Sequence, residues 1–173
     1  MSNIIEIKAR CSDPERIHHY LKAHKAVFKG LDHQIDTYFV VPNGRLKLRQ
    51  GKVESALIHY QRANQAGPKL SEVSLYTSAD YDALQKTLAR ALGVWVVVDK
   101  KRSIYFIENV KFHVDEVKGL GSFMEIEAID ESEERPLEQL RQQCDYYLAQ
   151  LDIRTEDLVD GSYSDLLAAK IEG

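Results

Sequence analysis

The sequence has few cysteines and lacks the common nucleotide and zinc motifs. Its two cysteines, Cys11 and Cys144, cannot build a disulfide framework, which favours a reducing, cytoplasmic setting. No Walker A, GxGxxG, CxxC or HExxH pattern is present, so P-loop, dinucleotide-fold and common zinc-site interpretations have no support. No apolar run approaches the roughly 18 residues of a membrane span, and Glu6, Lys8 and Arg10 argue against a secretory signal. We therefore expect a cytoplasmic protein with no membrane partner.

Charge of each sign is concentrated in a separate part of the chain. The net charge of -4 conceals this segregation. Residues 42–62 are basic, with Glu54 as their lone carboxylate, whereas residues 115–134 are acidic, with Lys118 as their lone cation. Strong patches of both signs indicate a substrate that needs both.

Two apolar periodicities alternate along the 173 residues, a length typical of one domain, so we treat 1–173 as a single domain. The period-two segments predict strands at 4–10, 35–41, 45–50, 53–62, 70–76, 94–107, 110–117 and 123–129. Helical spacing predicts helices that begin near Ser12, Ser78 and Pro136, and a short one at 165–169. Short turns join most of the strands. We predict an α+β protein with an eight-stranded, mainly antiparallel closed β-barrel and helices packed outside it.

Nearly every predicted strand has one apolar face and one ionic face. Arg45, Lys47 and Arg49 share a face, as do Glu125 and Glu127, because alternate residues of a strand point the same way. An open sheet with one face in water would explain any single strand. Rows of one charge repel along a solvated face, however, and the helices need an apolar surface to cover. We therefore favour a barrel whose ionic faces point inward and form a polar tunnel.

A tunnel of this kind suits a phosphate-rich ligand and a hard metal ion. Arg and Lys rows bind phosphate oxygens through charge-assisted hydrogen bonds. Adjacent carboxylates offer the oxygen ligands that Mg²⁺ or Mn²⁺ prefers, and the two features together favour phosphoryl transfer. His113 shares the face of Lys111 and Asp115. We interpret it as a structural histidine whose hydrogen bonds are satisfied.

Seven short motifs follow one another in order along the chain. They are Glu6-x-Lys8, Asp36-Thr-Tyr38-Phe39, Gly44-Arg-Leu-Lys-Leu-Arg49, Tyr60-x-Arg62, Lys100-x-Arg102-x-x-Tyr105, Asp115-x-Val-x-Gly-Leu-Gly121 and Phe123-x-Glu125-x-Glu127. This series resembles the CYTH superfamily, the triphosphate tunnel metalloenzymes, over roughly residues 3–167. The superfamily includes class IV adenylate cyclases, thiamine triphosphatases and inorganic triphosphatases.

The resemblance implies an eight-stranded tunnel that binds a triphosphate together with Mg²⁺ or Mn²⁺. The implied metal ligands are Glu6, Glu125 and Glu127, with Asp115 in or next to that shell. Lys8 and Asp115 are the implied catalytic residues. The implied phosphate-binding residues are Lys8, Arg45, Lys47, Arg49, Arg62, Lys100, Arg102 and Lys111.

One position departs from the family pattern. Ile4 stands where the N-terminal ExExK signature has its first glutamate, so one carboxylate is missing from the implied metal site. Three interpretations stay open: a single tightly bound metal, a site completed by Asp115, or weakened catalysis.

The resemblance leaves the reaction open. Segments 3–10 and 44–49 are most similar to the class IV adenylate cyclase-like branch, which favours conversion of ATP to cyclic AMP and pyrophosphate. The alternatives are hydrolysis of an inorganic or organic triphosphate, such as thiamine triphosphate, and a non-catalytic module that binds nucleotide or polyphosphate. We expect ATP, tripolyphosphate or a similar triphosphate as the partner. We expect no nucleic acid, because the basic rows should face inward, and a homodimer is compatible with the sequence.

Overall fold

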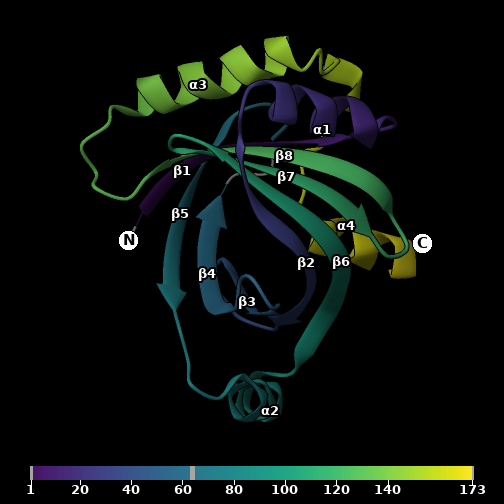
Figure 1. The fold of residues 1–173 in the computed structure, drawn as a ribbon. Coiled ribbons are helices and arrows are strands. Elements are labelled where there is room, and N and C mark those ends of the chain that lie inside the picture. The colour runs from purple at the N-terminus through teal and green to yellow at the C-terminus, as the bar shows by residue number, and fades with distance from the viewer. Residues whose placement is uncertain (1, 63–64, 173) are drawn as a thin grey trace.

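The barrel predicted from the sequence is present in the structure, a computed structural model that describes residues 2–62 and 65–172. Its eight strands close in the order β1-β5-β4-β3-β2-β6-β7-β8, and each neighbouring pair is antiparallel (Figure 1). The strands are β1 (Ser2–Arg10), β2 (Val27–Phe39), β3 (Arg45–Gln50), β4 (Ala56–Arg62), β5 (Lys69–Tyr76), β6 (Val94–Ile107), β7 (Val110–Val117) and β8 (Gly121–Asp130). The helices are α1 (Pro14–Ala23), α2 (Tyr81–Leu92), α3 (Leu137–Gln150) and α4 (Tyr163–Glu172), with a 3-10 turn, η1, at Thr155–Asp157.

Helix ends follow local sequence signals. The Asp13 carboxylate accepts a hydrogen bond from the backbone N–H of Arg16 at the start of α1, and Asp80 accepts one from Ala83 at the start of α2. Gly93 ends α2 with a φ of 82°, a conformation that glycine adopts without strain. No helix among the described residues has the length and apolar character needed to cross a bilayer.

The main hydrophobic core lies outside the barrel, between its wall and two helices. Helices α1 and α3 lie across β1, β7 and β8 on one side of the barrel (Figure 1). The outward residues of these strands fill this layer with side chains from both helices. The fully buried members include Ile5, Ile7, Ala9, Phe112, Met124, Ile126, Leu21, Leu140 and Cys144. The ionic residues that alternate with them therefore point into the barrel.

Two segments differ from the predicted strands. Strand β2 begins at Val27 rather than at residue 35, because its polar first half pairs with β6, from Val27 opposite Phe106 to Gln34 opposite Lys100. Residues 53–55, predicted as strand, form a loop held by Asp32. The buried carboxylate of Asp32 accepts hydrogen bonds from the backbone N–H groups of residues 52, 53 and 54 at 2.7, 3.1 and 3.0 Å. Both differences come from contacts between segments distant in sequence, β2 with β6 and Asp32 with the 52–54 backbone.

Burial of α3 against the barrel generates a stability prediction. Leu140→Ala should lower the free energy of unfolding by about 2–5 kcal/mol, because its fully buried side chain would leave a cavity. Leu137→Ala, on the same helix but 41% exposed, should change it by less than about 1 kcal/mol. Urea unfolding followed by circular dichroism measures both, and equal losses would contradict the packing described.

Candidate functional site

The inward faces of the strands enclose a cavity of about 460 Å³. Cationic, acidic and aromatic side chains from most of the strands line it. They include Lys8, Lys47, Arg49, Lys100, Arg102, Lys111, Glu6, Asp36, Glu54, Glu125, Glu127, His113, Tyr38 and Tyr60. Ser162 and Tyr163, at the start of α4, complete part of the wall. A volume of this size accommodates a small organic ligand.

Asp36 organises one wall of the cavity. Arg49 donates two hydrogen bonds of 2.9 Å to its carboxylate, Lys100 donates one of 2.6 Å, and the Lys47 ammonium lies 3.7 Å away. Burial by itself would raise the pKa of Asp36, but Arg49, Lys100 and Lys47 hold it well below its usual value. Burial lowers the pKa of Lys100, with Asp36 opposing this shift and Arg49 adding to it. This wall is therefore crowded with positive charge that an added anion would relieve.

On another part of the cavity wall, Arg102 is a single cation held by carboxylates, chiefly that of Asp115. Arg102 donates hydrogen bonds of 2.8 and 2.7 Å to the two Asp115 oxygens, and the Tyr163 hydroxyl donates another of 2.7 Å. Burial would raise the pKa of Asp115, but Arg102 lowers it. Because Asp115 is 2% exposed and both its oxygens are engaged, its contacts are those of a residue that orients Arg102. Its expected roles in metal binding and catalysis stay predictions.

Glu54 is a cavity residue that the sequence reasoning did not select. Its carboxylate pairs with Lys111, lies 3.9 Å from Arg49 and accepts a hydrogen bond from Gln34. Burial would raise the pKa of Glu54, but Lys111 and other nearby positive charges hold it far below its usual value. The sequence signal that could have identified Glu54 is that it is the lone carboxylate in the basic segment 42–62.

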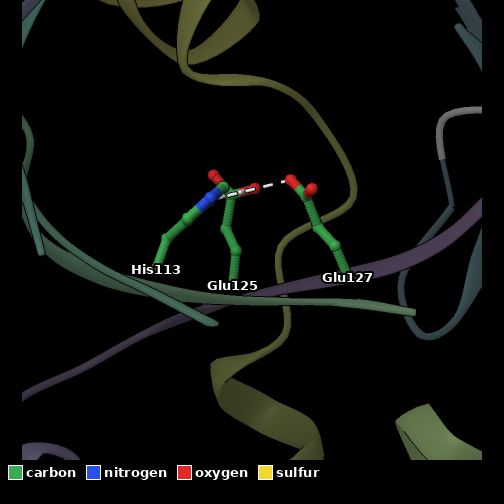
Figure 2. A group of neighbouring side chains, drawn as sticks. All are labelled: His113, Glu125 and Glu127. Carbon is green, nitrogen blue, oxygen red and sulfur yellow. Dashed lines mark ion pairs between the residues drawn. The ribbon is translucent and has the colours of Figure 1, made fainter. Parts of the chain in front are cut away.

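His113, Glu125 and Glu127 form a compact cluster of candidate metal ligands. One ligand atom from each lies within 4.8 Å of the other two, and all three side chains project from β7 and β8 into the barrel (Figure 2). Burial raises the pKa of Glu127 to about 7, with Lys111 opposing and Glu125 adding to the shift. Burial and the Arg102 charge lower the pKa of His113 to about 4. Two carboxylates beside a neutral imidazole are a donor set that fits a divalent cation.

The remaining predicted site residues are placed as follows. Glu6 and Lys8 line the cavity. In the register of β1 with β8, Glu6 lies opposite Glu127 and Lys8 lies opposite Glu125. Arg45 lies away from these groups, with its guanidinium 4.7 Å from the Trp95 ring centroid and 3.0 Å from Asp165. Arg62 ends β4, and its side chain lies outside the described residues. The phosphate-binding roles of all these cations stay predictions.

A closed antiparallel barrel whose cavity holds paired ions and a carboxylate–imidazole cluster defines a tunnel-type β-barrel protein. The CYTH domain model matches residues 3–163, and the chain belongs to this family. No curated protein matches the sequence.

Solved structures with the same fold span nearly the whole chain. The PH1012 protein of Pyrococcus horikoshii OT3 is 24% identical with a TM-score of 0.82, covering 94% of this chain and 98% of that one. A "putative adenylate cyclase" of Vibrio parahaemolyticus is 20% identical with a TM-score of 0.74, covering 95% and 97%. HpAC1 of Hippeastrum, in which a triphosphatase activity dominates, is 14% identical with a TM-score of 0.59, covering 99% and 96%. At these low identities the TM-scores show a shared fold alone.

The ion cluster around Asp36 predicts a pH-dependent stability. Asp36→Asn should lower the free energy of unfolding at pH 7 by about 3–5 kcal/mol, because Arg49 and Lys100 would lose their buried partner. The folded-state pKa of Asp36 is depressed, so its contribution is complete above the ordinary value of about 4 and disappears as the pH falls below it.

Urea unfolding at several pH values measures this contribution. The gap between wild type and Asp36→Asn should narrow as the pH falls below about 4. Asp99→Asn is the control, because the partly exposed Asp99 carboxylate forms its ion pair with the exposed His33. A gap that is absent at pH 7 or independent of pH would contradict the arrangement.

Proposed function

We propose that the protein is a divalent-metal-dependent enzyme that acts on an organic triphosphate, with conversion of ATP to cyclic AMP and pyrophosphate as the leading reaction. The observation that carries this proposal is a single cavity that combines buried cations, a candidate metal cluster and an apolar rim. The family assignment supports it, because triphosphate chemistry is the activity that the motif resemblance implies.

The cations supply the phosphate-binding part of the proposal. In the free protein, carboxylates pair with Arg49, Lys100 and Lys111. These pairs compensate the buried positive charges, so the protein can fold without a ligand. Phosphate oxygens offer the same kind of charge-assisted contacts, so a triphosphate can share or replace those partners. The positive charges would then stabilise the negative charge that collects on the leaving pyrophosphate.

An apolar rim favours an organic triphosphate over inorganic tripolyphosphate. Leu75 and Val53 line the cavity although they are 65% and 45% exposed. Ile4, Phe106 and Ile129 line it as well, and Ile4 is paired with Ile129 across β1 and β8. Exposed apolar side chains beside a charged cavity gain stability when a base or another organic ring covers them. A bare polyphosphate has no group to place there.

His113, Glu125 and Glu127 would hold the metal, either Mg²⁺ or Mn²⁺. When bound, it would supply charge neutralisation and orientation for the phosphates. Arg102 and Lys8 both approach Oε1 of Glu125, at 3.2 and 3.8 Å, which orients this carboxylate. Asp115, which accepts a hydrogen bond from the Tyr163 hydroxyl, in turn fixes Arg102. In the proposed cyclisation the ribose 3′-oxygen forms a bond to the α-phosphorus as the bond between that phosphorus and the pyrophosphate oxygen breaks. The 3′-hydroxyl proton is released to solvent and pyrophosphate is the leaving group.

Hydrolysis of an organic triphosphate is the second candidate. It requires the same cations and metal cluster but a water molecule as the nucleophile. The dominant triphosphatase activity of HpAC1, which has this fold, is the observation that favours it.

Product analysis tests the proposed function. Purified protein is incubated with Mg²⁺ or Mn²⁺ and either ATP or tripolyphosphate, and the products are separated by chromatography. We expect cyclic AMP and pyrophosphate from ATP. Orthophosphate from ATP would support hydrolysis instead, and turnover of tripolyphosphate alone would contradict an organic substrate. If neither turns over, a melting temperature raised by triphosphate would favour a non-catalytic binding module, and no binding at all would reject that module as well as the enzyme.

Glu127→Gln should lower this turnover by about 100-fold or more, because it removes one charged ligand from the cluster. Glu116→Gln, an exposed change on the same strand pair, is the matched control and should retain full activity. Circular dichroism checks that both variants are folded. Retained activity in Glu127→Gln would remove this residue from the site.

The apolar rim generates a separate specificity prediction. Leu75→Ser should raise KM for ATP by about three- to tenfold, since it removes apolar contact with the organic group. Val97→Ser alters a strand residue that is 50% exposed and outside the set that lines the cavity, and it should leave KM unchanged. Steady-state kinetics compares the two, and equal effects would argue against the rim as a binding surface.

A further inference from the structure

His113 is buried without the hydrogen bonds that a structural histidine requires. It is 1% exposed, and neither ring nitrogen has a hydrogen-bond partner among residues 2–62 and 65–172. Leaving a buried polar group unpaired destabilises the folded state. The expectation of a satisfied structural histidine is therefore wrong, and the orphaned nitrogens indicate a ligand.

Two carboxylates, those of Glu125 and Glu127, face the same ring nitrogen of His113. Its Nδ1 lies 3.7 Å from Oε2 of Glu125 and 3.6 Å from Oε1 of Glu127, which is too long for hydrogen bonds (Figure 2). Arg102 and Lys8 approach the other oxygen of Glu125, Oε1, so Oε2 is turned toward the imidazole. An imidazole nitrogen that faces two carboxylate oxygens without a hydrogen bond to either is placed to share a cation with them.

The size of the cluster matches one cation. Its three ligand atoms lie within 4.8 Å of one another. This span is about twice the length of a bond between a divalent cation and oxygen or nitrogen, roughly 2.0–2.6 Å. Strand register holds the set together, because His113 and Glu125 are direct cross-strand partners and Glu127 is two residues farther along β8.

We propose that His113 is a ligand of the metal site and makes this site select a first-row transition ion, such as Mn²⁺ or Co²⁺, over Mg²⁺. This inference rests on the metal site of the proposed function and specifies its ion. Imidazole nitrogen suits transition ions, whereas Mg²⁺ prefers oxygen ligands and keeps several of its waters. His113 also supplies a third donor in a chain whose N-terminal motif has Ile4 in place of a glutamate.

Metal binding to the free protein tests this inference without any substrate. Mn²⁺ is titrated and followed by electron paramagnetic resonance, and Mg²⁺ affinity is obtained by competition with bound Mn²⁺. His113→Asn should weaken Mn²⁺ binding by about tenfold or more and Mg²⁺ binding by less than about threefold. Pulsed measurements on bound Mn²⁺ should show a nitrogen coupling that this variant loses.

His19→Asn, an exposed change on α1, is the matched control and should leave both affinities unchanged. Thermal melting of the metal-free proteins establishes that each variant is folded. If His113→Asn does not fold, the nitrogen coupling in the wild-type protein decides alone. No Mn²⁺ binding, no nitrogen coupling, or equal losses for Mn²⁺ and Mg²⁺ would overturn the inference.

The test separates this inference from the proposed function. His113-dependent Mn²⁺ binding without turnover of any triphosphate would leave the ligand assignment intact and reject the enzyme. Turnover of ATP with unchanged Mn²⁺ binding in His113→Asn would support the enzyme and reject His113 as a metal ligand.

Discussion

A charge buried inside a barrel needs an opposite charge beside it, and this requirement organises the interior of the protein. The register places several pairs directly opposite one another, among them Asp36 and Arg49, and Arg102 and Asp115. Desolvation would otherwise make each of these groups costly. The paired walls can therefore persist without a ligand. The cluster of His113 and the β8 glutamates lacks such complete pairing, which makes it the part of the cavity suited to an added cation.

The same constraint explains why the hydrophobic core lies outside. Strand side chains alternate between two faces, so an ionic interior makes the outer face apolar. Helices α1 and α3 cover that face over β1, β7 and β8, where Ile7, Phe112 and Ile126 are buried. The helices are thus a condition for the charged cavity as well as a source of stability, because without them the outward apolar face would be exposed to water.

Much of the fold and part of the site could be predicted because period-two alternation identifies strands and sorts their faces. Arg45 marks the limit of this reasoning. Its position in the alternation places it on the same face as Lys47 and Arg49. As the first residue of β3, however, it turns to Trp95 and Asp165. Glu54 was missed for the opposite reason. It belongs to no strand, and Asp32, which binds the backbone of residues 52–54, helps to hold it beside Lys111.

By itself, the sequence determined the alternating strands, the approximate starts of the helices, and the family. These depend on local spacing and on short ordered motifs. Only the tertiary structure decided which charges meet, because barrel closure pairs β1 with β8 and β2 with β6 across long stretches of chain. It also decided the state of His113. Burial and the presence of hydrogen-bond partners are properties of the assembled barrel, and no spacing in the sequence reveals an imidazole left without them.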